Sequence, residues 1–487
     1  MSLTSDLGDR FKAEFIGKAI AVLSGGILTI VLVRLLDPDS YGLLFLAISV
    51  LGTVKLLSQF GIAKSAARYV AEYKETNVGQ LPHILKFSFI LNIGAITVVS
   101  TIFLIGHKFI ATLIGEPDLV PMLRIGVLFV IFSTLMWFVR TILQGLEAIK
   151  PAATVHALDR GSRLVFAVGF VLLGYEAIGA LVGYILASTI AALFGLVYLY
   201  FQYYREMSPT GIEQGIRRRI VEYSIPLTIT GTAGVLDKRI DTVLVGFFIG
   251  PVAVAYYTVS RQIIQFITAP IEALGFTLSP TYEAQKAKGN SEVAGQIYEE
   301  ALSHGLLLYI PAAAGLILVA EPLVTVVFGE GYLGAVPVLQ VLAVFAVLQS
   351  VKILTDNGLD FLGRARDRAI TKSVAAILNF CLNLILIPWI GVVGAALATV
   401  ISDIMYTCVN IYIMHSEMNL HLYNIIHHLG RVLGITAIMS ATVYLTTNIS
   451  TGYMSLIIMI STGVITWFIL VTTLGIIDLK RIYLVLS

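Results

Sequence analysis

Charged residues are scarce in this 487-residue sequence: Asp, Glu, Lys and Arg make up 13% of it, and hydrophobic residues make up 57%. A soluble globular protein carries about 25% charged residues, so that class is excluded. The mean hydropathy of +0.89 is typical of a chain that crosses a membrane several times. The formal net charge of +2 argues against a nucleic-acid-binding protein.

The sequence also lacks the motifs of covalent chemistry. It contains no HExxH, no Walker-type glycine loop, no GxSxG and no clustered metal ligands. The two cysteines, Cys381 and Cys408, both fall inside apolar segments and indicate neither a disulfide nor a redox compartment. We therefore expect a protein that is not an enzyme, with no catalytic residue, no metal and no cofactor.

Long apolar segments, in contrast, fill the chain. A membrane-spanning helix needs roughly 20 mainly apolar residues. About fourteen such segments are centred near residues 25, 51, 96, 132, 163, 189, 236, 266, 313, 346, 379, 402, 438 and 466. The expected fold class is therefore an all-α polytopic membrane protein with about 14 transmembrane helices. The first segment lacks a signal-peptide cleavage site, so we expect it to be retained.

The distribution of Lys and Arg predicts the orientation of these helices. One set of alternate connections contains nearly all of the basic residues, such as Arg217 to Arg219, and the other contains little beyond Lys108. Short loops rich in Lys and Arg stay in the cytoplasm. We therefore expect a multi-pass protein of the cell (plasma or inner) membrane with both termini cytoplasmic, whose basic loops also suit anionic membrane lipids.

An internal repeat predicts the domain organisation. A shift of about 214 residues places FLIGHKFIATLIGE (103–116) on ILVAEPLVTVVFGE (317–330), and further pairs follow in the same order. We predict an N-terminal six-helix lobe at 1–205, a C-terminal six-helix lobe at 206–418 and two additional transmembrane helices at 419–487. Because each half has an even number of helices, both halves enter the membrane from the same face, and the repeat is parallel. Transporters built from parallel repeats bind substrate between the halves.

The segment GVLDKRIDTVLVG (234–246) places Asp237, Lys238, Arg239 and Asp241 inside a predicted span. A charge at mid-bilayer costs at least about 2.5–3.5 kcal/mol, so it normally faces a cavity, a partner or the bundle interior. The matching segment of the first half, LSGGILT (23–29), is uncharged. This asymmetry favours a substrate or ion site, although an Asp–Lys–Asp ion cluster would give the same pattern.

Other basic residues lie within predicted spans. Lys55, Arg140 and Lys352 fall in inner halves, whereas Arg34 and Arg261 lie toward outer ends, where a purely interfacial position is equally open. An excess of cations around a cavity suits an anionic substrate, and Arg matches phosphate oxygens bidentately. The predicted substrate-binding residues are Arg239, Lys238, Lys55, Arg140, Lys352, Arg34 and Arg261. Asp237 and Asp241 are predicted to hold a coupling cation or to form salt bridges.

Three segments carry a resemblance to a known family: LVRLLDPDSYG (32–42), IDTVLVGFFIGPVAVAYY (240–257) and IPWIGVVGAALATVIS (387–402). Together they resemble the polysaccharide-export, or O-antigen flippase, branch of the multidrug/oligosaccharidyl-lipid/polysaccharide (MOP) exporter superfamily. The resemblance implies a two-lobed, MATE-like fold and export of a polyprenyl-(pyro)phosphate-linked oligosaccharide, with cationic residues on the phosphate link. Asp241 and Arg34 match the family pattern.

Two alternatives remain open at this stage. A cation-coupled multidrug antiporter of the same superfamily needs an acidic cavity, and the spans here lean basic. A polytopic glycan polymerase or ligase needs a sizeable outer loop, and the outer connections here are short turns. As partners we expect the lipid-linked oligosaccharide, membrane lipids and glycan-assembly proteins of the same pathway, with the protein itself a monomer and no nucleic acid bound.

Overall fold

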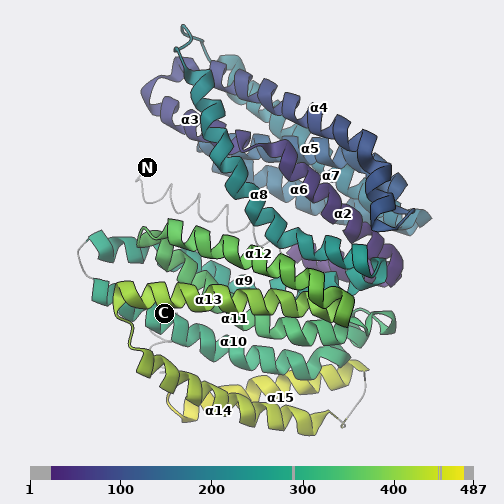
Figure 1. The fold of residues 1–487 in the computed structure, drawn as a ribbon, viewed down its shortest axis with the longest axis vertical. Helices are drawn as coiled ribbons and strands as arrows, with labels where there is room; N and C mark the ends of the chain where they lie inside the picture. The colour runs from purple at the N-terminus through teal and green to yellow at the C-terminus, as the bar shows by residue number, and fades with distance from the viewer. Residues whose placement is uncertain (1–22, 288–290, 448, 450–451, 477–487) are drawn as a thin grey trace. The chain divides into compact units, whose positions relative to one another are not determined.

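The computed structural model describes residues 23–287, 291–447, 449 and 452–476, and within them every regular element is a helix (Figure 1). The first described helix, Leu23–Leu35, precedes α2 and carries no label. The remaining α-helices are α2 (Pro38–Gln59), α3 (Ile62–Thr76), α4 (Leu81–Ile114), α5 (Leu119–Gly145), α6 (Ile149–Phe170), α7 (Glu176–Gln202), α8 (Ile216–Phe248), α9 (Pro251–Ala287), α10 (Ser291–Val327), α11 (Ala335–Phe361), α12 (Ala365–Ile390), α13 (Val392–Met418), α14 (Leu422–Thr446) and α15 (Gly452–Thr473).

The predicted fold class is confirmed. Each of the fourteen predicted segments coincides with a helix, the first being described from Leu23 onward. Ten segments of the described chain are long and apolar enough to cross a membrane, and one of them, Ile149–Glu206, contains both α6 and α7. The start of α2 is stabilised by its own sequence, because Asp37 accepts a hydrogen bond from Ser40 N at 2.7 Å and Pro38 occupies the first turn.

The helix α3 was not predicted. It has 15 residues and is too short and too polar to cross a membrane. Ile62, Ala66, Tyr69 and Tyr73 recur at helical spacing and are buried, so one face of α3 packs on the protein while the other stays exposed. A search for long apolar runs cannot detect such an amphipathic helix.

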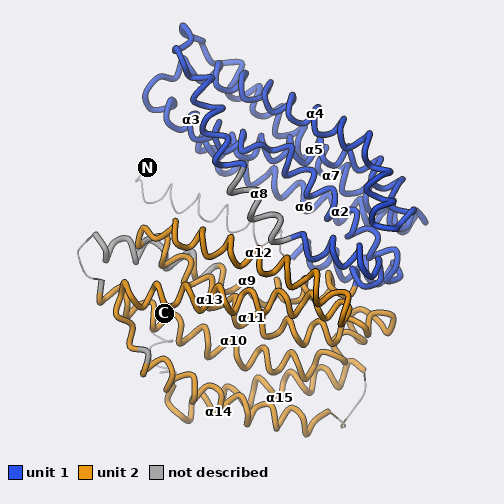
Figure 2. Tube along the Cα trace, viewed as in Figure 1, with its two compact units in different colours: residues 1–255 blue, residues 256–487 orange. Residues whose placement is uncertain are grey.

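The chain divides into two compact units, residues 1–255 and 256–487, coloured separately in Figure 2. The core of unit 1 is built from α3, α4, α5, α6, α7 and α8, and it includes the fully buried Val139 and Ile142 of α5. The core of unit 2 gathers Tyr298, Leu354 and Met414 from α10, α11 and α13. The C-terminal pair α14 and α15 packs on α10, where Val432 and Val471 contact Leu307.

The helix α8 belongs to unit 1 by its contacts. Ser65 of α3 donates to the Ile220 carbonyl at 2.8 Å, and Arg239 donates to the Ile48 carbonyl of α2 at 2.9 Å. The sequence repeat assigned this helix to the second lobe. The contacts of a helix and its position in a sequence repeat are different properties, and a helix of the second repeat can pack on the first. The domain boundaries 1–205, 206–418 and 419–487 therefore stay a prediction.

A glycine at the α6–α7 contact gives a test of this packing. A Cβ atom on Gly183 would lie 2.3 Å from the Ala167 nitrogen and 2.4 Å from its Cα, and backbone atoms cannot move aside cheaply. We expect Gly183→Ala to destabilise unit 1 by about 1–3 kcal/mol, measured as a lower Tm of the purified protein in detergent. The control is Gly169→Ala on α6, where a Cβ meets nothing within 4 Å. Equal Tm values for the two variants would contradict the close contact.

Candidate substrate site

Five basic side chains from four helices gather in unit 1, and we call them the basic cluster. They are Lys55 of α2, Arg140 of α5, Arg160 and Arg163 of α6, and Arg239 of α8. The charges of Arg163, Arg239 and Arg160 all act on Lys55, and the charges of Arg163 and Arg140 act on Arg160. Residues far apart in the sequence are thus brought within electrostatic reach of one another.

Arg239 is held by α2. Its Nη1 donates to the Ile48 carbonyl at 2.9 Å, and its guanidinium lies against Gly52. A Cβ atom on Gly52 would come within 2.3 Å of Arg239 Cζ, so the missing side chain leaves the space that the guanidinium occupies. One residue of α2 therefore accepts a hydrogen bond from Arg239 and another makes room for it.

Asp159 is the carboxylate of the cluster. Its Oδ2 lies 2.7 Å from Arg163 Nη2 one helical turn away, and the two side chains are 1% and 12% exposed. Arg163 also lies over the Tyr184 ring of α7, 4.9 Å from its centroid. Over the described residues, the five basic side chains and this one carboxylate give a formal net charge of +4 (5 − 1).

Two of the cations form no ion pair with any described carboxylate. Within the described part of the chain, neither Lys55 nor Arg160 forms an ion pair or a side-chain hydrogen bond, and the Arg160 Nε is buried without an acceptor. A buried donor that lacks an acceptor costs about 1–3 kcal/mol, and more when it is charged. An anionic ligand that accepts these hydrogen bonds would recover that cost.

The predicted site residues are distributed unequally. Lys55, Arg140 and Arg239 lie in the basic cluster, and Arg140 also lies 5.9 Å from the Trp137 ring centroid. Asp241 is 1% exposed in α8, and Arg34 is exposed near the end of the first described helix. The side chains of Asp237 and Lys238 lie outside the described residues.

Three residues of the cluster were missed by the sequence analysis: Asp159, Arg160 and Arg163. The segment DRGSR (159–163) falls within the apolar stretch that the sequence analysis centred near residue 163. Charges inside a predicted span were the signal used for the segment at 234–246, and the same signal was present here.

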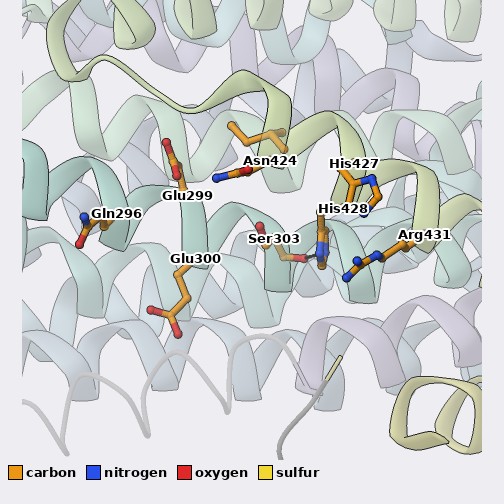
Figure 3. Close-up of a pocket in the computed structure, with 9 residues that line it drawn as sticks. Gln296, Glu299, Glu300, Ser303, Asn424, His427, His428 and Arg431 are labelled. Carbon is orange, nitrogen blue, oxygen red and sulfur yellow. Dashed lines mark hydrogen bonds between the residues drawn. The ribbon is translucent and has the colours of Figure 1, made fainter. Parts of the chain in front are cut away.

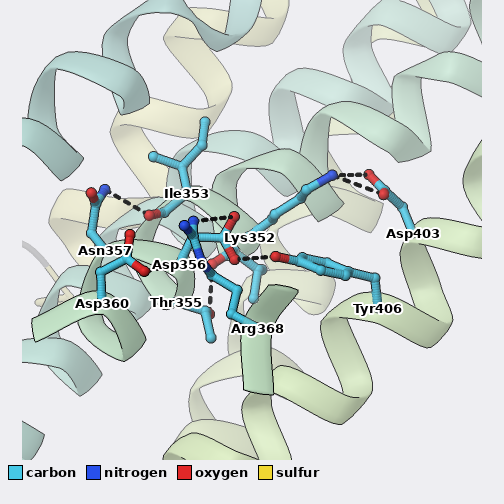
Figure 4. A network of polar contacts seen from close by, with 10 residues as sticks. Lys352, Ile353, Thr355, Asp356, Asn357, Asp360, Arg368, Asp403 and Tyr406 are labelled. Carbon is cyan, nitrogen blue, oxygen red and sulfur yellow. Dashed lines mark hydrogen bonds and ion pairs between the residues drawn. The ribbon is translucent and has the colours of Figure 1, made fainter. Parts of the chain in front are cut away.

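Lys352 and Arg261 lie in unit 2, and Lys352 is engaged by a carboxylate (Figure 4). Its Nζ donates to the two Asp403 oxygens at 2.9 and 3.1 Å and lies 4.9 Å from the Tyr406 ring centroid. Asp403 belongs to α13 and lies 51 residues along the chain from Lys352, so residue spacing within one helix does not reveal this pair. Substrate contact by Lys352 or by Arg261, which donates to the Tyr257 hydroxyl at 3.3 Å, stays a prediction.

The polar network around Lys352 is not net cationic. The Tyr406 hydroxyl donates to Asp356 Oδ1 at 2.6 Å, and Arg368 pairs with Asp360 at 3.0 Å and with Asp356 at 3.6 Å (Figure 4). Its three carboxylates, Asp356, Asp360 and Asp403, therefore face three cations: Lys352, Arg368 and Lys372, whose charge also acts on Asp356. Among the described residues, the formal charge of the basic cluster in unit 1 is positive, whereas that of the Lys352 network in unit 2 is balanced.

Comparison with known proteins identifies the family. A family model described as polysaccharide biosynthesis protein matches residues 15–281, more than half of the 487-residue chain. The chain belongs to the polysaccharide biosynthesis protein family. A second model, MatE, matches residues 226–385. This polysaccharide biosynthesis protein is a membrane exporter of the MOP superfamily and not an enzyme, and the resemblance predicted from sequence is confirmed.

Individual relatives agree with this family. The chain is 24% identical over 427 residues to the lipopolysaccharide biosynthesis protein WzxC of Escherichia coli, covering 85% of this chain and 82% of that protein. It is 25% identical over 203 residues to the probable low-salt glycan biosynthesis flippase Agl15 of Haloferax volcanii. That match covers 42% of this chain and 43% of Agl15.

Solved structures confirm the MATE-like fold. The lipid II flippase MurJ in an inward closed conformation superposes with a TM-score of 0.78 at 15% identity, covering 95% of this chain and 98% of MurJ. An inward-facing multidrug resistance MATE family transporter of the MOP superfamily superposes with a TM-score of 0.70 at 17% identity, covering 83% and 98%. At these identities the likeness establishes the fold alone.

The Asp159–Arg163 pair gives a test of the cluster. Asp159→Asn removes the carboxylate and leaves a buried guanidinium uncompensated, so we expect a loss of about 3–5 kcal/mol in stability. The measurement is the Tm in detergent. Glu222→Gln is the matched control, because its pair with Arg218 has the same spacing but side chains 55% and 82% exposed, and we expect no measurable change. Equal shifts in Tm would contradict the burial of the Asp159 pair.

Proposed function

We propose that this protein is a flippase that moves a polyprenyl-(pyro)phosphate-linked oligosaccharide from the cytoplasmic to the outer leaflet by alternating access, for cell-surface polysaccharide or glycan synthesis. The named relatives support this substrate class: a glycan biosynthesis flippase, a lipopolysaccharide biosynthesis protein and, in Bacillus subtilis, a teichuronic acid biosynthesis protein. Both termini in the cytoplasm, a monomeric state and glycan-assembly partners belong to the same proposal.

The observation that carries the proposal is the net positive charge of the basic cluster. Its cations outnumber its described carboxylate five to one, and among the described residues Lys55 and Arg160 form no ion pair of their own. A phosphate or pyrophosphate link supplies several negative oxygens, and guanidinium groups bind such oxygens in pairs. In this proposal the cluster binds the charged link, while the neutral sugars need no charged contact.

The second candidate is a cation-coupled multidrug antiporter of the same superfamily. The MatE match and the carboxylates of unit 2 favour it, since a cationic drug or coupling ion requires acidic groups. The basic cluster argues against a cationic cargo in unit 1. Asp237 and Asp241 remain candidates for a coupling cation or for salt bridges, and the buried position of Asp241 is compatible with both.

Arg160 provides a direct test of the basic cluster. We expect Arg160→Gln to lower glycan export by about 10–100-fold, because a charge-assisted hydrogen bond contributes about 1.5–3 kcal/mol. Export is measured by restoring surface glycan in cells that lack their own copy, with protein level followed by immunoblot. Arg218→Gln, an exposed cation of unit 1, is the control. Normal export by both Arg160→Gln and Arg239→Ala would contradict the assignment of the basic cluster as the substrate site. Resistance to cationic drugs conferred by the wild-type protein would favour the antiporter.

Gly52 offers a second, independent test. We expect Gly52→Ala to reduce export, because its methyl group displaces the Arg239 guanidinium, and to leave stability nearly unchanged, because that guanidinium is the flexible end of a side chain. In an Arg239→Ala background the same substitution should have no further effect. Gly94→Ala on α4, where a Cβ meets nothing within 4 Å, is the control. An equal loss in both backgrounds would show that Gly52 does not act through Arg239.

A further inference from the structure

In unit 2, α10 and α14 lie side by side and run in the same direction. His428 Nε2 donates to the Ser303 carbonyl at 3.0 Å, a separation of 125 residues. Further along, a Cβ on Gly315 would lie 4.0 Å from Met439 Cε, a separation of 124 residues (439 − 315). The offset changes by only one residue between the two contacts, so the two helices run in parallel along this α10–α14 seam and the groups on it follow a fixed order.

A polar pocket of about 410 Å³ lies at the first part of the seam (Figure 3). Glu300 of α10 and Arg431 of α14 lie on opposite sides of the Ser303–His428 contact. Among the described residues neither of the two forms an ion pair, whereas the neighbouring Glu299 accepts hydrogen bonds from His421 at 2.5 and 3.2 Å. The pocket therefore presents one available anion and one available cation.

An apolar groove, also about 410 Å³, follows along the same two helices. Its walls include Leu308, Pro311 and Gly315 of α10, Met439 of α14 and Trp467 of α15. The Trp467 indole donates to the Leu307 carbonyl at 3.2 Å, which places α15 against α10 beside the groove. The pocket and the groove have no lining residue in common, but they follow one another along the same two helices. A polar pocket and an apolar groove in this order match a molecule with a polar head and a hydrocarbon chain.

We propose that the α10–α14 seam binds one zwitterionic membrane lipid, separate from the transported substrate. Arg431 binds the head-group phosphate, Glu300 binds the head-group ammonium, and the hydrocarbon chain lies in the groove, where it removes apolar surface from water. Glu300 disfavours a head group that carries only negative charge. The basic cluster in unit 1 has a formal net charge of +4 (5 − 1) and therefore favours a ligand that carries only negative charge.

The test is native mass spectrometry of the purified full-length protein, relipidated with phosphatidylethanolamine, phosphatidylglycerol or undecaprenyl phosphate. We expect one phosphatidylethanolamine to be retained per protein. Arg431→Gln and Glu300→Gln should each lower its occupancy about ten-fold, since each removes one charge-assisted contact. Gly315→Phe, which fills the groove, should do the same. The controls are Arg366→Gln, an exposed cation of α12, and Gly434→Phe, an exposed glycine of α14 whose Cβ meets nothing within 4 Å.

The outcomes separate the possible occupants. Equal retention of phosphatidylglycerol would overturn the zwitterionic assignment. Displacement of phosphatidylethanolamine by undecaprenyl phosphate would assign the seam to a polyprenyl carrier and overturn the proposal. Unchanged occupancy in Arg431→Gln and Glu300→Gln, both monodisperse by size exclusion, would overturn it as well. Because the readout is lipid retention and not export, these results are independent of the proposed flippase function.

Discussion

The constraint on which the structure depends is the cost of a charge inside a membrane-spanning helix. Such a charge must find an opposite charge, a carbonyl, an aromatic ring or a ligand. Asp159 and Arg163 pair across one turn, Arg239 donates to the Ile48 carbonyl, and Lys352 donates to Asp403. Each solution links the buried charge to a specific neighbour. The helices that carry these residues are consequently held in one register by polar contacts as well as by apolar packing.

The two units satisfy this constraint in different ways. In unit 2 the described cations of the Lys352 network meet an equal number of carboxylates, so the charges are balanced within the protein. In unit 1 the described cations exceed the described carboxylate, and in the proposed function the anionic substrate supplies further acceptors for them. The fold is shared with flippases and drug transporters alike. The difference in chemistry is therefore carried by side chains and not by architecture.

The proposed lipid site along α10 and α14 differs from the basic cluster in its balance of positive and negative charge. Glu300 and Arg431 offer one charge of each sign beside an apolar groove, whereas the basic cluster offers cations in excess. A head group with both signs fits the first, and a phosphate link fits the second. One protein can in this way bind a membrane lipid and an anionic substrate at separate places without competition between them.

The sequence by itself determined the fold class, the fourteen helical segments, the family, and Lys55, Arg140 and Arg239 as candidate site residues. These follow from apolar run length and from the cost of charge within a run, both of which are local properties. Only the tertiary structure decided that Arg160 and Arg163 join those three, and that Lys352 meets Asp403, 51 residues away. Helical periodicity reports which residues share a face of one helix, but it does not report which helix lies against that face. For this reason the partners of the buried charges depend on packing between helices.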